Sequence, residues 1–539
     1  MQQEAYAPTL DTPDLTAVFA RIVGADHARD DEAIRALHSE DVWQASPATV
    51  ALVVSPGSTD EVVAVAKAAH AAGYAIAPRG AGMSYTAGYV PAHHRTISLD
   101  MSRMNRILRL SREDMTITVE AGATWTAVHV ALAAQGLRLP FWGPMSGLSS
   151  TIGGGVSQLN AMFGAGHYGT SSESVVALKV VTADGAIVRT GARGPDGDTP
   201  HYRHFGPDLT GLFCGDCGTL GIKAEVTLRL ITAPAFEDTA SFSFQSGEAL
   251  LQAMAEIARS GVAAETCAFD PGLTVVRMKR ASLAGDIKTL GKVVAKEKSF
   301  GKGLLAAAKI AMGGRNFIAP TDYPFHFACE GRSRAAVEAD MAEARRICLS
   351  FGGAEIENTI AKVIRAMPFP ALNSMLGPTG EAWVPCHGVV SLSTAPAIFA
   401  EVQAVFARRR AEMEAAEIHT GFLFTTMATN AIVIEPVFFW PQGWRKIHES
   451  AVEPSHLARL TQRPLHPEAT ALVTALRKEL IAIFARYGAG HFQIGRTYPY
   501  RESRDAVSQA LLDAVKHVTD PDGLLNPGVL GFPDAGGKA

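Results

Sequence analysis

The chain has 539 residues, of which 47% are hydrophobic and 19% charged, and its formal net charge is −4. This length and composition are typical of a globular protein with a large core and two or more domains, and the slightly negative charge disfavours a nucleic-acid partner. The sequence shows no secretory signal, bilayer-spanning apolar run or disulfide framework, so the cytoplasm is the expected compartment and no transmembrane segment is expected.

The first elements expected form a β-α-β unit. Residues Thr49–Val54 have the apolar pattern of a strand, and Ser58–Glu61 is a capping box that begins a helix over residues 60–72. Gly73 ends this helix, and Tyr74–Ala77 is the next strand. The residues that follow lie at the end of a β-α-β unit, where ligands commonly bind.

Residues 78–88 read Pro-Arg-Gly-Ala-Gly-Met-Ser-Tyr-Thr-Ala-Gly. Glycine lets another molecule approach the backbone closely, and successive N–H groups in such a turn form a concave anion site. The stretch predicts a diphosphate site with Arg79 and Ser84 as further donors, and an ordinary glycine-rich turn is the alternative. Tyr85 stands where the usual dinucleotide fingerprint needs its third glycine, and no nucleoside-triphosphate P-loop occurs.

Two further glycine clusters follow, Gly143–Gly155 and Gly215–Ile222. Their small residues would let the backbone lie flat against a planar ligand. Cys214 and Cys217 form a lone Cys-x-x-Cys and are expected to be reduced thiols, and no metal site is expected. The other elements expected here are strands at Thr96–Leu99, Thr116–Glu120, Val175–Thr182, Ala186–Thr190 and Ala224–Leu230 and a helix at Thr124–Gln135.

The composition changes at Pro234, after which helices and strands alternate. The lysine-rich segment 279–315 has two interpretations, a basic amphipathic pair on a membrane or a solvated helical face, and the second is favoured. A final helix is expected at Asp505–Val518. The other helices expected are Gly247–Arg259, Ser333–Phe351, Ala395–Ala416 and Pro467–Tyr487, and the strands are Trp383–Leu392, Phe422–Ala428 and Ala431–Phe439.

Taken in order, these motifs resemble the FAD-binding signature of the vanillyl-alcohol oxidase/p-cresol methylhydroxylase superfamily. The segments that carry the resemblance are Arg79–Ser84, Ser150–Gly154, Tyr168-Gly169, Thr182–Gly185, Gly218–Ile222 and Asp520–Gly528. The resemblance implies an α+β fold with a two-subdomain FAD-binding domain over residues 1–235. It also implies an α+β cap with an antiparallel sheet over the flavin at 236–490, and a C-terminal return to the first domain at 491–539.

The same resemblance implies FAD as the cofactor. The residues that it assigns to cofactor binding are Arg79, Gly80, Ala81, Gly82, Met83, Ser84, Pro144, Ser149, Ser150, Thr151, Gly153, Gly154, Gly218, Gly221, Ile222 and Asn526. Many relatives tether the flavin through a histidine just before the serine of the first loop. Met83 occupies that position here, so dissociable FAD is expected.

Within the superfamily the chain is most similar to the para-substituted-phenol oxidases, on residues 84–91, 98–106 and 495–497. In those enzymes two tyrosines and an arginine hold the substrate as a phenolate. Tyr85 and Arg496 match this pattern, whereas Gly495 stands in place of the second tyrosine, and Tyr498 and Tyr500 are its candidate substitutes. Alternation along a strand over His491–Tyr500 would put Arg496, Tyr498 and Tyr500 on one face.

The leading hypothesis is an FAD-dependent oxidoreductase that takes hydride from a small aromatic alcohol or para-alkylphenol, with His387 as a further active-site candidate. A 2-hydroxy-acid or polyol dehydrogenase on the same fold is the alternative, and a non-catalytic flavin-binding protein is a third reading. The expected partner is a small, aromatic substrate. A second copy of the chain, forming a homodimer, and an electron-acceptor protein are further candidates.

Overall fold

The computed structural model describes residues 14–280 and 321–534 of the chain. Apart from the end of helix α9 (Pro271–Arg280), the lysine-rich segment 279–315 lies outside the described residues. Within the described part, no helix combines the length and the apolar character that crossing a membrane requires.

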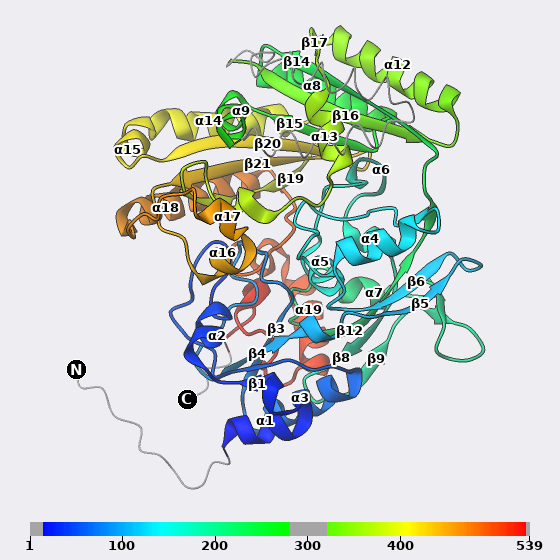
Figure 1. Cartoon of the computed structure of the whole chain (residues 1–539), viewed down its shortest axis with the longest axis vertical. Helices are drawn as coiled ribbons and strands as arrows, with labels where there is room; N and C mark the ends of the chain where they lie inside the picture. The colour runs from blue at the N-terminus through cyan, green and yellow to red at the C-terminus, as the bar shows by residue number, and fades with distance from the viewer. Residues whose placement is uncertain (1–13, 281–320, 535–539) are drawn as a thin grey trace.

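The N-terminal half of the molecule begins with a small sheet in the order β1-β2-β4-β3 (Figure 1). The pairings of β2 with β4 and of β3 with β4 are parallel, and the helix α3 connects β2 to β3 as predicted. Ser58 caps α3 by accepting a hydrogen bond from the Glu61 N–H at 3.2 Å, which confirms the predicted helix start. The elements are β1 (Ala28–Arg29), β2 (Leu52–Val54), β3 (Ala75–Arg79), β4 (Thr96–Asp100), α1 (Leu15–Val23), α2 (Glu32–Leu37) and α3 (Thr59–Ala71).

A second sheet, antiparallel and in the order β5-β6-β12-β8-β9, lies beside the first. Its strands are β5 (Ile107–Ser111), β6 (Thr116–Glu120), β8 (Val175–Val181), β9 (Ile187–Arg189) and β12 (Ile222–Arg229). The helices α4 (Trp125–Ala133), α5 (Ile152–Gln158), α6 (Ala165–Tyr168) and α7 (Leu209–Leu212) and the short strands β7 (Leu137–Arg138), β10 (Ala192–Arg193), β11 (Pro200–Tyr202) and β13 (Ile231–Thr232) complete this half.

The cap is built on one large antiparallel sheet, in the order β17-β14-β16-β15-β20-β21-β18, with β19 also paired to β21. Helices α8, α12 and α14 pack against it on the upper side of Figure 1. Its strands are β14 (Phe236–Phe244), β15 (Glu265–Phe269), β16 (Tyr323–Gly331), β17 (Ala354–Ile356), β18 (Ala382–Pro385), β19 (Gly388–Ser391), β20 (His419–Met427) and β21 (Ala431–Trp440). Its helices are α8 (Gly247–Ser260), α9, α12 (Arg334–Ser350), α13 (Thr359–Ala366), α14 (Ala395–Arg408), α15 (Arg410–Ala415), α16 (Lys446–Ala451), α17 (Pro454–Leu457) and α18 (Pro467–Arg486).

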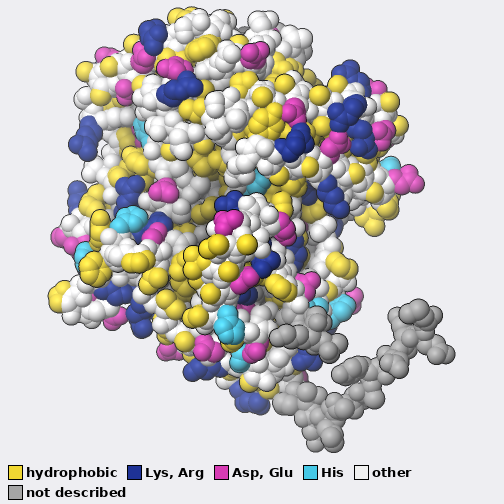
Figure 2. Space-filling model, turned by 180° about the vertical axis from the view of Figure 1, so that it is seen from behind, with side chains coloured by type: hydrophobic (Ala, Val, Ile, Leu, Met, Phe, Trp, Pro, Cys, Tyr) yellow, Lys and Arg dark blue, Asp and Glu magenta, His cyan; other side chains and the backbone are white. Residues whose placement is uncertain are grey.

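After α18 the chain returns to the first domain, where its last long helix, α19 (Ala506–Thr519), lies near β12 and β3 in Figure 1. The strand considered for His491–Tyr500 does not form. Gln493 and Gly495 have φ of 51° and 57°, left-handed values that interrupt an extended chain, so Arg496, Tyr498 and Tyr500 do not share a strand face. On the face seen in Figure 2, basic and acidic side chains are interspersed rather than separated into patches of one sign.

A buried ionic cluster ties the cap to the first domain. Arg138 of β7 donates two hydrogen bonds to Glu330 of β16, at 2.5 and 2.7 Å. Arg365 of α13 contacts Glu330 at 3.0 Å and Glu265 and Glu237 at 2.5 Å. Because the two arginines are shared among three carboxylates, removal of either one leaves a buried negative charge without its partner.

We expect Arg365→Met to lower the free energy of unfolding by about 3–5 kcal/mol, the cost of breaking a buried ion pair. Arg346→Met is the matched control, since Arg346 pairs with Glu343 on the exposed surface of α12 and should cost less than about 1 kcal/mol. Urea unfolding followed by tryptophan fluorescence measures both variants. Equal losses in the two would show that the cluster does not hold the cap.

Candidate functional site

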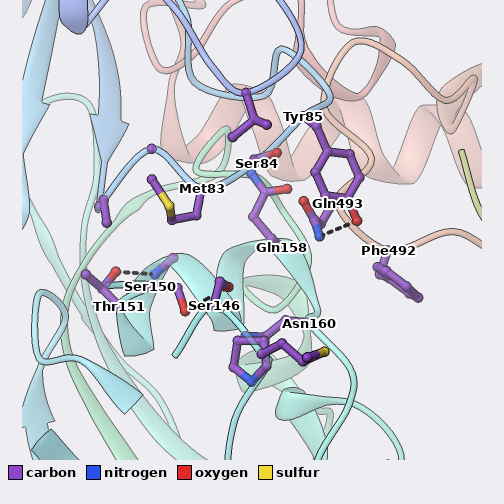
Figure 3. Close-up of a pocket in the computed structure, with 18 of the residues that line it drawn as sticks. Met83, Ser84, Tyr85, Ser146, Ser150, Thr151, Gln158, Asn160, Phe492 and Gln493 are labelled. Atoms are coloured by element: carbon purple, nitrogen blue, oxygen red, sulfur yellow. Dashed lines mark hydrogen bonds between the residues drawn. The ribbon is translucent and has the colours of Figure 1, made fainter. Parts of the chain in front are cut away.

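A long cavity lies between the glycine loops of the first domain and the cap sheet (Figure 3). Nearly all residues expected at the cofactor line it. They are Arg79, Gly80, Ala81, Gly82, Met83, Ser84, Pro144, Ser150, Thr151, Gly153, Gly154, Gly218, Gly221 and Ile222. Ser149 and Asn526 are not among the lining residues. The fold thus brings three glycine clusters that are far apart in the sequence to one surface.

The first loop presents free backbone donors to this cavity. Within the described residues, no protein oxygen accepts a hydrogen bond from the backbone N–H groups of residues 80–83. Gly82 has φ of 76°, a left-handed value that favours glycine, and a side chain there would overlap the Arg79 guanidinium. Successive N–H groups without protein acceptors fit the diphosphate of FAD.

Arg79 itself does not point its guanidinium at an anion. The group donates to the carbonyl oxygens of Glu40 and Leu37, at 2.9 and 3.1 Å, and so anchors the loop. The expectation that Arg79 supplies an extra donor to the diphosphate therefore differs from its geometry. The hydrogen-bond donors that this loop leaves for an anion are therefore its backbone N–H groups.

The second glycine cluster forms the start of α5 and is packed from behind. Thr151 caps the helix by accepting from the Gly154 N–H at 3.2 Å. A β-carbon at Gly153 would collide with Ala121, and one at Gly80 would lie 2.5 Å from the Thr151 hydroxyl oxygen. Ala121 can pack against Gly153, and Thr151 against Gly80, only because the two glycines lack a side chain.

The cap wall of the cavity follows the alternation of two paired strands. Leu423 and Thr425 of β20 face it, and opposite them in register stand Glu435 and Val433 of β21. Val437 and Phe439 continue the same face of β21. This wall is apolar except for Thr425 and Glu435, and Glu435 is the one carboxylate among the described lining residues.

Polar groups gather where the first domain meets the cap. The Gln493 side-chain amide donates to the Tyr85 hydroxyl at 3.0 Å (Figure 3). The Trp383 ring packs edge-on against Tyr85, with centroids 5.6 Å apart. Burial raises the pKa of the Tyr85 hydroxyl well above its usual value, and the nearby Glu435 raises it further. Tyr85 is therefore a protonated donor at neutral pH.

Two expected catalytic residues lie behind this wall, outside the cavity lining. His387 is fully buried, its ring stacks on Phe492 with centroids 3.8 Å apart, and its Nε2 donates to the Phe492 carbonyl at 2.6 Å. The Tyr498 hydroxyl accepts from the His387 backbone N–H at 2.8 Å and lies 3.2 Å from Nδ1. Burial holds the pKa of His387 well below its ordinary value, so the ring is neutral.

Arg496 binds backbone. Its guanidinium donates to the carbonyl oxygens of Ala87, Val90 and Pro527, at 2.6, 2.9 and 2.6 Å. Neither it nor Tyr500 lines the cavity. The substrate-oxyanion role that the resemblance implied for Arg496 thus differs from its geometry, in which all its contacts stabilise loops. Tyr500 packs at the edge of the core, with the Arg504 guanidinium over its ring.

Gln493, Glu435 and Trp383 also line the cavity and were not among the expected site residues. Glu435 is a charged residue in an otherwise apolar strand, and such a break in the apolar pattern can mark a functional residue. Gln493 belongs to the polar and aromatic segment His491–Tyr500, but its position depends on a left-handed turn between Phe492 and Ile494 that the sequence did not predict.

Two family models match the chain. The model described as "FAD binding domain" matches residues 50–191, and the model described as "FAD linked oxidases, C-terminal domain" matches residues 494–530. The first covers the first two glycine clusters, and the second covers the C-terminal return.

Several curated relatives are hydroxy-acid enzymes by name. The glycolate oxidase subunit GlcD of Bacillus subtilis is 29% identical over 267 residues, 49% of this chain and 55% of that protein. The probable mitochondrial D-lactate dehydrogenase of Danio rerio is 32% identical over 259 residues, 48% and 50% of the two chains. The chain thus spans about half the length of these relatives. A D-2-hydroxyglutarate dehydrogenase of Xanthomonas citri pv. viticola is 27% identical over 90% of each chain.

Solved structures match over nearly the whole chain. A p-cresol methylhydroxylase with substrate bound superposes with a TM-score of 0.71 at 16% identity and covers 96% of both chains. An alkyldihydroxyacetonephosphate synthase gives 0.69 at 17% identity, over 97% of this chain and 87% of that one. At such identities the likeness shows the fold alone, and it confirms the expected mixed fold with a sheet-containing cap.

We expect Gly82→Val to reduce bound FAD by tenfold or more, because valine is strained at positive φ and would fill the space beside residues 80–83. Gly197→Val is the matched control, with φ of 72° and no atom near its added β-carbon. Flavin absorbance per protein measures both. Equal flavin content in the two variants would contradict the placement of the diphosphate.

For Arg496→Lys we expect a lower melting temperature and lower FAD content, since one ammonium cannot replace a fork bound to three carbonyls. Turnover per bound flavin should stay within about twofold. The control is Arg504→Lys, an exposed neighbour whose guanidinium hydrogen-bonds only the Ser503 hydroxyl among the described residues. A stable variant that keeps its flavin and loses turnover would instead place Arg496 at the substrate.

Proposed function

We propose that this chain, which carries the FAD-binding and C-terminal domains of the FAD-linked oxidases, oxidises a small uncharged aromatic alcohol or para-alkylphenol. FAD supplies the two-electron acceptor that takes up the hydride. The single observation behind the proposal is the cavity wall opposite the glycine loops. It combines apolar and aromatic side chains with a few hydrogen-bonding groups.

The cationic side chains that line the cavity already have hydrogen-bond or ion-pair partners within the protein. Among the described lining residues these are Arg79, which binds two carbonyls, and Lys223, which pairs with the buried Asp216. A substrate carboxylate would therefore lie in the same cavity as the Glu435 carboxylate while both lining cations are held by other groups, and burial of an unpaired charge is costly. This electrostatic balance favours a neutral substrate.

Residues of the chain bind and orient such a substrate. Tyr85 can donate its O–H to the substrate oxygen, and Trp383, Leu423 and Phe439 provide an apolar enclosure that excludes water. When a benzylic alcohol loses hydride, its hydroxyl proton leaves as well and the carbonyl compound forms. When a para-alkylphenol loses benzylic hydride, its phenolic proton leaves and the quinone methide forms. The carboxylate of Glu435 is the basic group within the lining that we assign to that proton.

A 2-hydroxy-acid dehydrogenase is the second candidate, and the names of the curated relatives favour it. It would need a cation released from its present partner to hold the substrate carboxylate. Lys223 is one of the two cations among the described lining residues, and its partner Asp216 is itself buried. The two candidates make opposite predictions for charged substrates.

We expect 4-alkylphenols or benzylic alcohols to bleach the oxidised flavin absorbance under anaerobic conditions, and glycolate, D-lactate and D-2-hydroxyglutarate to leave it unchanged. Stopped-flow absorbance gives the rate for each compound. Bleaching by the hydroxy acids alone would favour the second candidate. Persistence of the oxidised spectrum with every compound would favour a flavin-binding protein without this activity.

A further inference from the structure

We infer that Tyr85 and Gln493 form a subsite that binds a neutral hydroxyl group and rejects its anion. The inference rests on the proposed function and deepens it, because it names the group by which the substrate is recognised. It also differs from the phenolate-binding arrangement of two tyrosines and an arginine that the sequence resemblance implied.

The inference rests on which hydrogen-bonding groups of Tyr85 and Gln493 have partners and which do not. Gln493 Nε2 donates to the Tyr85 hydroxyl oxygen at 3.0 Å, which leaves the Tyr85 proton free to donate elsewhere. Gln493 Oε1 is buried, and among the described residues no group donates to it. Both residues line the cavity, and Figure 3 shows their side chains next to each other, joined by this hydrogen bond. The pair therefore presents one unused donor beside one unused acceptor.

A hydroxyl group matches this pair, because it accepts one hydrogen bond and donates another. A phenolate or a carboxylate can only accept, so either anion would leave Gln493 Oε1 facing negative charge. A hydrogen atom or a halogen in place of the hydroxyl would leave both protein groups unpaired, and buried sites discriminate strongly against such analogues.

The surrounding charges act in the same direction. Glu435 lies in the same cavity wall, and its field adds to burial in holding the Tyr85 hydroxyl protonated. Arg477 acts in the opposite sense, but its guanidinium lies over the Trp43 ring and reaches Tyr85 only at the backbone carbonyl, at 3.4 Å. Arg477 does not line the cavity.

The fold holds Gln493 in place at a conformational cost. Its φ of 51° is uncommon outside glycine, and its N–H donates to the Gln158 carbonyl at 2.6 Å. His387 clamps the preceding residue by its stack on Phe492 and its bond to the Phe492 carbonyl. His387 and Tyr498 are thus positioning residues for Gln493.

Ligand binding to the FAD-loaded enzyme tests the subsite without turnover. Phenol lacks a benzylic carbon and cannot be oxidised by hydride loss there, and fluorobenzene and benzoate are its hydroxyl-free and charged analogues. Perturbation of the flavin absorbance gives each Kd. We expect phenol to bind at least tenfold more tightly than either analogue. With 4-nitrophenol, which ionises near neutral pH, Kd should rise as pH passes through the ligand's own pKa.

Tyr85→Phe and Gln493→Asn should each weaken phenol binding by about 10- to 100-fold and leave fluorobenzene binding and flavin content unchanged. Asparagine tolerates a left-handed backbone, so the second variant keeps the turn. The double variant should lose no more than about the larger single loss, because the pair acts as a unit. Gln403→Asn and Tyr323→Phe are matched controls, since these residues form a similar amide–phenol pair on the cap surface.

Tighter binding of 4-nitrophenolate than of 4-nitrophenol would overturn the inference, as would variants that bind phenol like the wild type or a wild type that binds no phenol. If Gln493→Asn loses flavin, phenol binding by Tyr85→Phe and the pH dependence of 4-nitrophenol binding to the wild type still test the subsite. Phenol binding as expected, without bleaching by any phenol or alcohol, would support the subsite and refute the proposed function. Bleaching without an effect of either variant would do the reverse.

Discussion

The cavity depends on backbone carbonyls that side chains of the C-terminal segment hold in place. Asn526 donates to the carbonyls of Gly88 and Cys217, at 2.6 and 2.7 Å, and so joins the end of the first glycine stretch to the third glycine cluster. The Arg496 guanidinium donates to the carbonyls of Ala87 and Val90, and Lys516 Nζ donates to the Thr219 carbonyl at 2.7 Å. Glycine loops have no side chains with which to fix themselves. Their shape is therefore imposed from the end of the chain, and the cavity can form only when that segment has returned.

The cofactor site therefore needs two kinds of residue, those that bind the ligand and those that hold the binding loops in shape. The glycine loops supply bare backbone N–H groups, and the C-terminal segment supplies the donors that fix those loops. The ionic cluster of Arg138 and Arg365 then sets the cap over them. We propose that the chemistry takes place in the region between these ties, where the described cavity lining includes Tyr85, Gln493 and Glu435. If so, single substitutions there should separate binding from folding.

Local rules predicted much of the fold and part of the site. The capping box at Ser58, the strand before the glycine loop and the paired cap strands depend on residues close in sequence, and they occur nearly where expected. The glycine clusters line the cavity, while their contacts with FAD stay predictions. Arg496 and Gln493 could not be placed this way. The sequence around an arginine does not show whether its side chain binds a substrate or three backbone carbonyls. The turn at Gln493 is held by contacts with His387 and Gln158, which lie more than a hundred residues away in the sequence.

The central claim is that one cavity holds FAD on the glycine loops and a neutral hydroxyl between Tyr85 and Gln493. A crystal structure of the FAD-loaded enzyme with phenol tests it most directly. We expect the diphosphate beside the N–H groups of residues 80–83. It also predicts the phenol oxygen within hydrogen-bond distance of both Tyr85 Oη and Gln493 Oε1, with no arginine or lysine in contact. A phenol oxygen bound to a cation, or a diphosphate away from the first glycine loop, would contradict it.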